Sequence, residues 1–154
     1  MMYKDESASN LDSIMNADQL HLVKKSWLVF RRIDPQLIGS VFYEKLFTDH
    51  PALKKMFSTS MEEQSRKFVA MLETMILHSC DDVKIADDLA ALALKHAAYH
   101  IKQEHYDAVG VALIWTLKQG LGRDWNAETE QAWIACYDML REKISNPSST
   151  KRTQ

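Results

Sequence analysis

Hydrophobic residues recur along this chain every three or four positions, and polar residues occupy the positions between them. Within residues 17–33, Leu20, Val23, Trp27 and Phe30 follow this spacing. The spacing places these side chains on one face of an α-helix. No stretch alternates between apolar and polar residues as a half-buried strand does. We therefore predict an all-α protein.

Helix start and stop residues divide this pattern into consecutive helices. Asn16 with Gln19, and Ser60 with Glu63, form capping-box sequences at two predicted helix starts. A third helix starts after Asp34, where proline occupies the first helical position. The boundaries predict a short turn over 52–57 and helices over 17–33, 35–49, 61–80, 83–99, 102–120 and 127–145.

Three glycines add detail to two of these helices. Gly39 lies in the middle of the second predicted helix, where glycine costs about 1 kcal/mol of helix propensity relative to alanine. A glycine at such a position indicates that another helix approaches its backbone closely. Gly120 and Gly122 predict the end of the helix that starts near residue 102. Periodicity alone does not separate a helical bundle from other packings of amphipathic helices.

Size and charge exclude several classes of protein. The 154 residues form one domain, and 19 basic against 21 acidic residues give a net charge of −2, without the basic patch of a nucleic-acid-binding protein. No apolar run spans a membrane and the first ten residues lack a signal-peptide core, so we expect a cytoplasmic protein.

Cys80 and Cys136 form no CxxC pair. We predict a flexible segment over 1–15, a domain over 16–146 and a disordered tail over 147–154.

One histidine lies within an apolar helical face. His96 shares this face with Leu89, Leu92 and Tyr99, and a buried imidazole needs a hydrogen-bond or metal partner. By itself His96 is more often a core histidine bonded to protein than a metal ligand. With His100 it forms an i, i+4 pair that could bind zinc, but the pair lacks the glutamate of a zinc hydrolase helix.

Four residues upstream of His96 keep fixed distances from one another. Phe57 lies six residues after Pro51 and fourteen after Tyr43, and Gln64 follows Phe57 by seven. In this register the chain resembles the globins. Phe57 matches the phenylalanine that stacks on haem, and His96 falls at the place of the iron-binding histidine.

Two further stretches narrow the resemblance. Trp27 in the sequence VKKSW, and the residues 104–110, are similar to single-domain bacterial globins of the flavohaemoglobin and neuroglobin-like lineage. The resemblance covers about residues 16 to 145. It implies a globin fold, a 3-over-3 helical sandwich with a short or absent fourth helix. It also implies haem b (iron protoporphyrin IX) as the cofactor.

The resemblance gives each matching residue an expected role. His96 would bind the iron, with Tyr43 and Gln64 facing a gas on the opposite, distal side. Tyr106 matches a tyrosine that orients the proximal histidine, and the accompanying glutamate position is Ser148. His100 replaces a residue that is usually glycine in similar bacterial globins. The other expected cofactor-binding residues, of which the two lysines would contact the haem propionates, are Phe57, Phe68, Leu92, Ile101, Val109, Lys67 and Lys95.

Each of these residues has a plainer interpretation by itself. Tyr43 would be a core aromatic residue, Gln64 a polar residue of a first helical turn, and Lys67 a solvated charge. The eight methionines are interpreted as core filling.

The Tyr43 and Gln64 pair sets the expected function. A bound O2 carries partial negative charge, so a phenol and an amide can both donate to it. Hydrogen bonds to charged groups contribute roughly 1.5–3 kcal/mol. The resemblance therefore predicts reversible, high-affinity binding of O2, and also of CO and NO, for oxygen storage, transport or scavenging.

Two other functions are compatible with the sequence. The same fold could act as a nitric oxide dioxygenase, and so detoxify nitric oxide, or as a nitrite reductase, each with a separate flavin reductase. It could also be a gas sensor or a haemless globin-like regulatory module. The sequence fits a monomer or a homodimer and gives no indication of nucleic acid or membrane as a partner.

Overall fold

The fold is described from a computed structural model, which describes residues 15–57, 59–78, 82–98 and 100–145. Among these residues there are helices and turns but no strand, which confirms the all-α prediction. The helices, in chain order, are α2 (Ala17–Phe30), α3 (Pro35–Asp49), η1 (Pro51–Met56), α4 (Met61–Leu77), α5 (Asp82–Ala98), α6 (Gln103–Leu121), η2 (Gly122–Asp124) and α7 (Ala127–Ser145).

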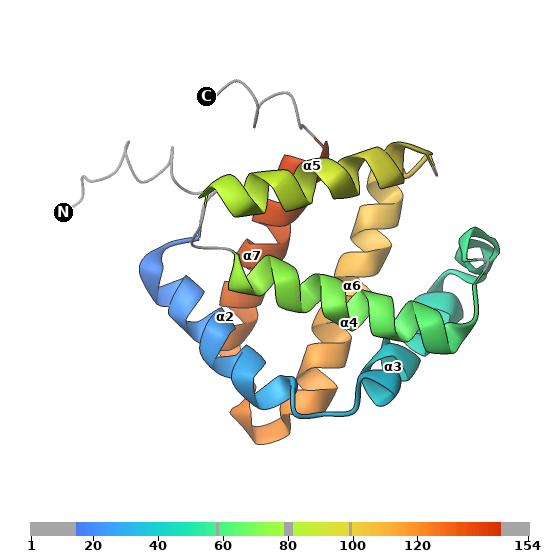
Figure 1. Ribbon diagram of the computed structural model, residues 1–154. Helices are drawn as coiled ribbons and strands as arrows, with labels where there is room; N and C mark the ends of the chain where they lie inside the picture. Colours follow the sequence, from blue (N-terminus) through green and yellow to red (C-terminus); the bar gives the residue numbers. More distant parts are fainter. Residues whose placement is uncertain (1–14, 58, 79–81, 99, 146–154) are drawn as a thin grey trace.

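The long helices form two crossed layers. Helices α2, α4 and α5 lie across α6 and α7, and α3 packs against both α4 and α6 (Figure 1). This is the 3-over-3 arrangement predicted from the sequence. No helix among the described residues separates η1 from α4, as the expected short or absent fourth helix requires. Within the same residues, no helix has the length and apolar character needed to cross a membrane.

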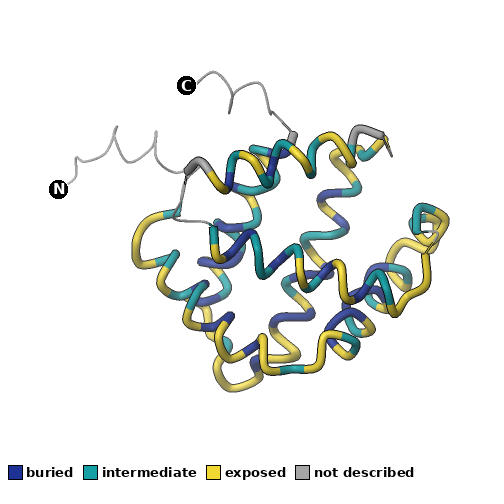
Figure 2. Tube along the Cα trace, in the orientation of Figure 1, coloured by how far each residue is buried: buried dark blue, intermediate teal, exposed yellow. Residues whose placement is uncertain are grey.

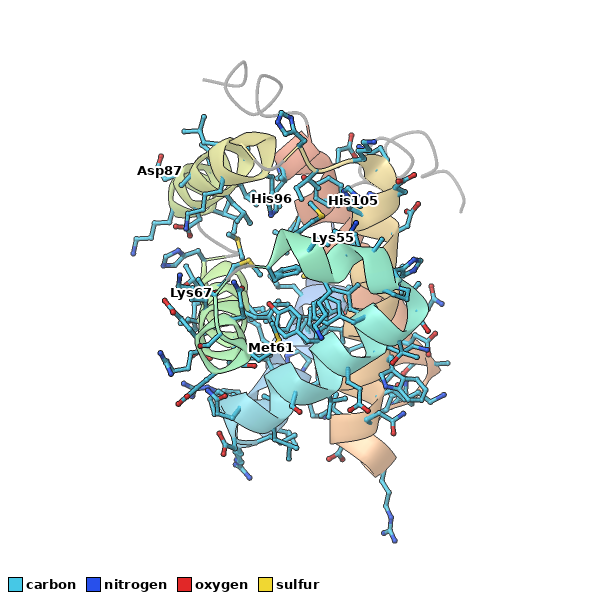
Figure 3. All side chains as sticks on the ribbon, turned by 90° about the vertical axis from the view of Figure 1, so that its right-hand side faces the viewer. Lys55, Met61, Lys67, Asp87, His96 and His105 are labelled. Carbon is cyan, nitrogen blue, oxygen red and sulfur yellow. The ribbon has the colours of Figure 1, made fainter. Side chains whose placement is uncertain are left out.

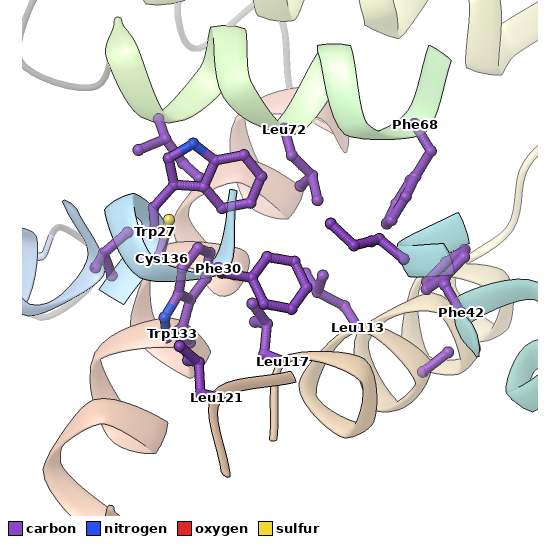
Figure 4. Close-up of a cluster of buried hydrophobic side chains, with 14 of the residues drawn as sticks. Trp27, Phe30, Phe42, Phe68, Leu72, Leu113, Leu117, Leu121, Trp133 and Cys136 are labelled. Atoms are coloured by element: carbon purple, nitrogen blue, oxygen red, sulfur yellow. The ribbon is translucent and has the colours of Figure 1, made fainter. Parts of the chain in front are cut away.

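The main core lies where α2, α6 and α7 meet. Trp27, Phe30, Leu117 and Trp133 are almost completely buried there (Figure 4). The indole nitrogen of Trp133 donates to the hydroxyl of Ser26 at 2.8 Å, so this buried polar group is satisfied. Buried positions follow the inward sides of the helices (Figure 2), as the amphipathic pattern predicts.

Of the two predicted capping boxes, the one at α2 is complete and the one at α4 is half formed. Asn16 and Gln19 form a complete capping box at α2. At α4 the Ser60 hydroxyl accepts from the Glu63 backbone at 3.2 Å. The Glu63 carboxylate instead pairs with Lys67 at 3.3 Å, so only half of the predicted box is formed.

Two helix ends differ from the prediction. Helix α2 ends at Phe30, and the three residues to Ile33 form a turn. Helix α6 continues through Gly120 to Leu121. Gly120 packs on the Phe30 ring, where there is no space for a side chain, so its role is in packing and not in ending the helix. The stop residue is Gly122, whose φ of 52° lies in the left-handed region.

Gly39 confirms the predicted close approach of two helices. A Cβ atom at this position would lie 2.0 Å from the Ser65 Oγ and 2.7 Å from the Ser65 Cα. Helices α3 and α4 therefore cross with almost no space between their backbones. This crossing fixes the relative positions of Tyr43 on α3 and Gln64 on α4.

Candidate functional site

A large cavity brings together side chains from both layers. Its volume is about 500 Å³, within the range of small-molecule and cofactor sites. Most of the lining is apolar and comes from α3, α4, α5, α6 and α7. In Figure 3 His96 lies between α5 and the start of α6, with His105 to its right and Lys67 at the left on α4.

All eleven residues expected from the sequence line this one cavity, although they are spread over more than 60 positions of the chain. They come from α3, α4, α5, α6 and the segments beside them. These residues are Tyr43, Phe57, Gln64, Lys67, Phe68, Leu92, Lys95, His96, Ile101, Tyr106 and Val109.

His96 lies in the last turn of α5 and is half-buried at the cavity wall. Its Nδ1 lies 3.3 Å from the Tyr106 hydroxyl, and the two rings meet edge to face. Burial, together with the charge of the adjacent Lys95, lowers the pKa of His96 below its usual value. The ring is therefore neutral at pH 7. Among the described residues, its Nε2 has no hydrogen-bond partner and is available to a metal.

The turn after α5 anchors the backbone of His96. The Ile101 amide donates to the His96 carbonyl at 3.1 Å. His100 has a φ of 57°, in the left-handed region that favours glycine. This bond has the 6→1 spacing of a Schellman motif, and His100 takes the left-handed conformation that glycine usually supplies there. The histidine at position 100, where similar globins usually have glycine, therefore leaves the turn in place and adds backbone strain.

Replacement of His100 by glycine is expected to stabilise the protein. The left-handed conformation costs a non-glycine residue about 1–2 kcal/mol, and the greater unfolded-state entropy of glycine offsets part of the gain. We expect the free energy of unfolding in urea to rise by about 0.5–1 kcal/mol. The matched control His100→Ala keeps the strain and should give no increase. Equal stability of the two variants would contradict this explanation.

Tyr43 lies on α3 and lines the cavity that His96 also lines. Its side chain is only 6% exposed and its ring packs against Phe42, Phe47, Phe57 and Phe68. Burial raises its pKa to about 12, so the phenol stays protonated. Among the described residues the hydroxyl has no hydrogen-bond partner. A buried donor without a protein partner at a cavity wall can bond to a molecule inside the cavity.

Gln64 lies near Tyr43, in the first turn of α4. Its side-chain amide nitrogen donates to the Thr59 hydroxyl, a contact that the sequence did not predict. Lys67 pairs with Glu63 and is mostly exposed, and Lys95 is exposed on α5. Both lysines lie where their ammonium groups can reach the rim of the cavity.

Sequence reasoning missed several cavity residues. The most notable is Arg141 of α7, whose guanidinium lies 5.7 Å from the centre of the Tyr106 ring. In a sequence, an arginine on an amphipathic helix is interpreted as a solvated charge. No sequence feature therefore distinguished Arg141 from the other surface arginines. Other lining residues that were not predicted include Met56, Met71, Met75, His105, Cys136, Tyr137 and Ile144.

Some predictions lie outside the described residues. Ser148, the position expected for a glutamate beside Tyr106, is one of them. Cys80 and Tyr99 are others, as are the two terminal segments 1–14 and 146–154. Cys136 is buried beside Trp133, and burial raises its pKa to about 12, which makes it an unreactive thiol.

The residues present fit a haem group. Apolar side chains on both faces suit a flat porphyrin, and an available imidazole nitrogen suits its iron. Basic side chains at the rim suit the propionates, and the unpartnered Tyr43 hydroxyl suits a polar ligand in the cavity.

Comparison with known proteins agrees with this fit. The family model "Globin" matches residues 40–144. The chain is 28% identical over 136 residues to a flavohemoprotein of Vibrio cholerae serotype O1, covering 84% of this chain and 33% of that protein. It is 30% identical over 142 residues to an anaerobic nitrite reductase of Gossypium hirsutum, covering 82% of this chain and 86% of that one. The chain thus spans about a third of the length of the flavohemoprotein.

Solved structures show the same fold. A hexacoordinated heme protein from an anhydrobiotic tardigrade superposes with a TM-score of 0.78 at 18% identity, covering 87% of this chain and 95% of that one. The hexa-coordinate hemoglobin of Drosophila melanogaster superposes with a TM-score of 0.77 at 15% identity, covering 86% of this chain and 94% of that one. The two sequence relatives come from a bacterium and a plant, so the bacterial lineage itself stays a prediction. The chain belongs to the globin family, and its cofactor is haem.

Proposed function

We propose that this globin binds O2 reversibly and with high affinity, and that it also takes CO and NO. The observation that carries the proposal is the placement of an available His96 nitrogen and an unpartnered Tyr43 hydroxyl around one apolar cavity. A haem held in this cavity would supply an iron atom that binds a diatomic gas reversibly. His96 is the proposed protein ligand.

The proximal residues hold His96 in the form that iron requires. A neutral imidazole that binds iron through Nε2 carries its hydrogen on Nδ1. That hydrogen can be donated to the Tyr106 oxygen, which lies 3.3 Å away. Tyr106 therefore fixes both the tautomer and the orientation of the ring.

The distal residues supply donors and exclude water. Tyr43 keeps its proton, because burial raises its pKa to about 12, so it can donate to a gas in the cavity. Gln64 can add a second donor when its amide leaves Thr59. Phe68 stacks on Phe42 with ring centroids 4.1 Å apart and closes this side with apolar bulk.

The rim completes the proposed haem site. Lys67 and Lys95 line the cavity and remain accessible, so their ammonium groups can pair with the two propionates. Such exposed pairs would contribute little affinity by themselves.

Titration of the haem-loaded ferrous protein with O2 tests this proposal. We expect one O2 to bind for each haem, with dissociation much slower than in a variant that lacks the distal donors. Rapid irreversible oxidation in place of O2 release would contradict a storage, transport or scavenging role. Sedimentation of the same sample distinguishes a monomer from a homodimer.

A second candidate function follows from the names of the relatives, a flavohemoprotein and an anaerobic nitrite reductase. The chain could turn over nitric oxide or nitrite when a separate flavin reductase supplies electrons. The two functions differ in stoichiometry. A storage protein consumes about one NO for each O2-loaded haem and stops, whereas an enzyme continues while reductase and NADH are present.

A further inference from the structure

We propose that Arg141 is a positioning residue that acts on the iron ligand through Tyr106 and shifts the haem toward its ferrous state. The inference rests on the proposed role of His96. It concerns a residue of α7 that no sequence feature marked, and it assigns a purpose to the one guanidinium among the described residues that line the cavity.

Several contacts hold the Arg141 guanidinium beside the Tyr106 ring. Its Nη1 pairs with the Asp107 carboxylate at 2.7 Å, and its Nη2 donates to the carbonyl and side-chain oxygens of Gln103 at 3.2 and 2.9 Å. The Arg141 side chain is 24% exposed, against 67% for Asp107. The cation therefore lies deeper than its counter-ion, at 5.7 Å from the centre of the Tyr106 ring.

A second contact keeps Tyr106 itself in place. The Tyr137 hydroxyl donates to the Tyr106 backbone carbonyl at 2.7 Å. The side chains of His96, Tyr106 and Arg141 thus form a continuous series of contacts from the cavity wall to α7. Through these contacts the charge of Arg141 can affect His96, the proposed iron ligand.

The sign of the effect follows from electrostatics. A cation over the phenol withdraws electron density from its oxygen, so Tyr106 becomes a weaker acceptor for the His96 Nδ1–H. The imidazole then stays fully neutral and donates less charge to the iron. A cation that lines the cavity would also disfavour the additional positive charge of ferric iron. Both effects favour ferrous iron, the state that binds O2.

Three variants separate this role from simple packing, and a fourth is the matched control. Arg141→Met removes the charge and keeps most of the volume, whereas Arg141→Lys keeps the charge. Asp107→Asn leaves Arg141 in place but removes its counter-ion. The control, Lys143→Met, removes the same charge from α7 at a position that does not line the cavity.

The measurement is the midpoint potential of the haem-loaded protein, with the iron–histidine stretching band of the ferrous form recorded by resonance Raman. We expect Arg141→Met to lower the potential, so that the ratio of ferric to ferrous haem at a fixed potential rises about three- to tenfold. It should also raise the frequency of the band. Arg141→Lys should stay near the wild type, Asp107→Asn should shift the potential upward, and Lys143→Met should leave both readings unchanged.

The outcomes distinguish this inference from the proposed function. Absence of an iron–histidine band from the wild type would overturn the role of His96, and the inference with it. If the wild type shows the band but Arg141→Met behaves as Lys143→Met does, the role of Arg141 alone is wrong. An upward shift of the potential in Arg141→Met would also overturn it. If Arg141→Met does not fold, Asp107→Asn decides, because an unchanged or lowered potential there contradicts the inference.

Discussion

Replacement of Tyr43 by phenylalanine is expected to raise the O2 dissociation rate about ten- to 150-fold. The substitution removes one hydroxyl from a side chain that is already packed among four phenylalanine rings, so its structural cost is small. What is lost is a hydrogen bond to a partly charged ligand, which contributes roughly 1.5–3 kcal/mol. At about 1.4 kcal/mol for each factor of ten, this range gives the stated change in rate.

Stopped-flow displacement of O2 by CO measures this rate. Thr116→Val is the control, because it removes a buried hydroxyl that donates to the Ala112 carbonyl and does not line the cavity. The difference between wild type and Tyr43→Phe should persist from about pH 7 to pH 10, since the phenol has a pKa of about 12 and keeps its proton over this range. Equal rates in wild type and Tyr43→Phe would remove Tyr43 from the distal site.

Replacement of Gly39 by alanine is expected to destabilise the fold by about 3 kcal/mol. The added methyl group would overlap the Oγ, Cβ and Cα atoms of Ser65, at 2.0, 2.2 and 2.7 Å. Because one of these atoms belongs to the backbone, a rotamer change cannot remove the overlap, and α3 must move away from α4. The gain in helix propensity from alanine, about 1 kcal/mol, offsets only part of this cost.

Unfolding in urea measures the loss, and a compensating variant tests its cause. The double substitution Gly39→Ala with Ser65→Gly moves the small residue to the other helix and should recover part of the stability. Ser65→Ala in the same background keeps the clashing Cβ and should recover less. A loss below about 1 kcal/mol for Gly39→Ala would mean that the two helices do not cross as closely as described.

The helices and the small residue at their crossing could be predicted because local chemistry decides them. Asn16 and Asp34 accept hydrogen bonds from backbone amides at helix starts, and Pro35 occupies a first helical position. Gly39 indicated the close approach of α3 and α4 for the same reason, because such a crossing requires one residue without a Cβ atom. Gly120 was misread because a glycine needed for packing on Phe30 and a glycine needed for a turn look alike in a sequence.

The site could be predicted as a set of positions but not as a network. Tyr43 and His96 each have a plain interpretation alone, and only their joint register with Gln64 and Phe57 indicated one cavity. The contacts of Gln64 with Thr59, and of Arg141 with Tyr106, depend on how side chains orient after the helices pack. No spacing rule describes such orientation, so these two contacts became visible only in the structure.

An absorption spectrum with chemical rescue tests the claim that His96 holds the haem iron. The ferrous and CO spectra are recorded for wild type, His96→Gly and His105→Gly, with and without added imidazole. His105 also lines the cavity and is the matched histidine control. We predict that His96→Gly loses the wild-type spectra when no imidazole is added and regains them when imidazole is added. His105→Gly should keep the wild-type spectra under both conditions. Wild-type spectra from His96→Gly without imidazole would contradict the claim.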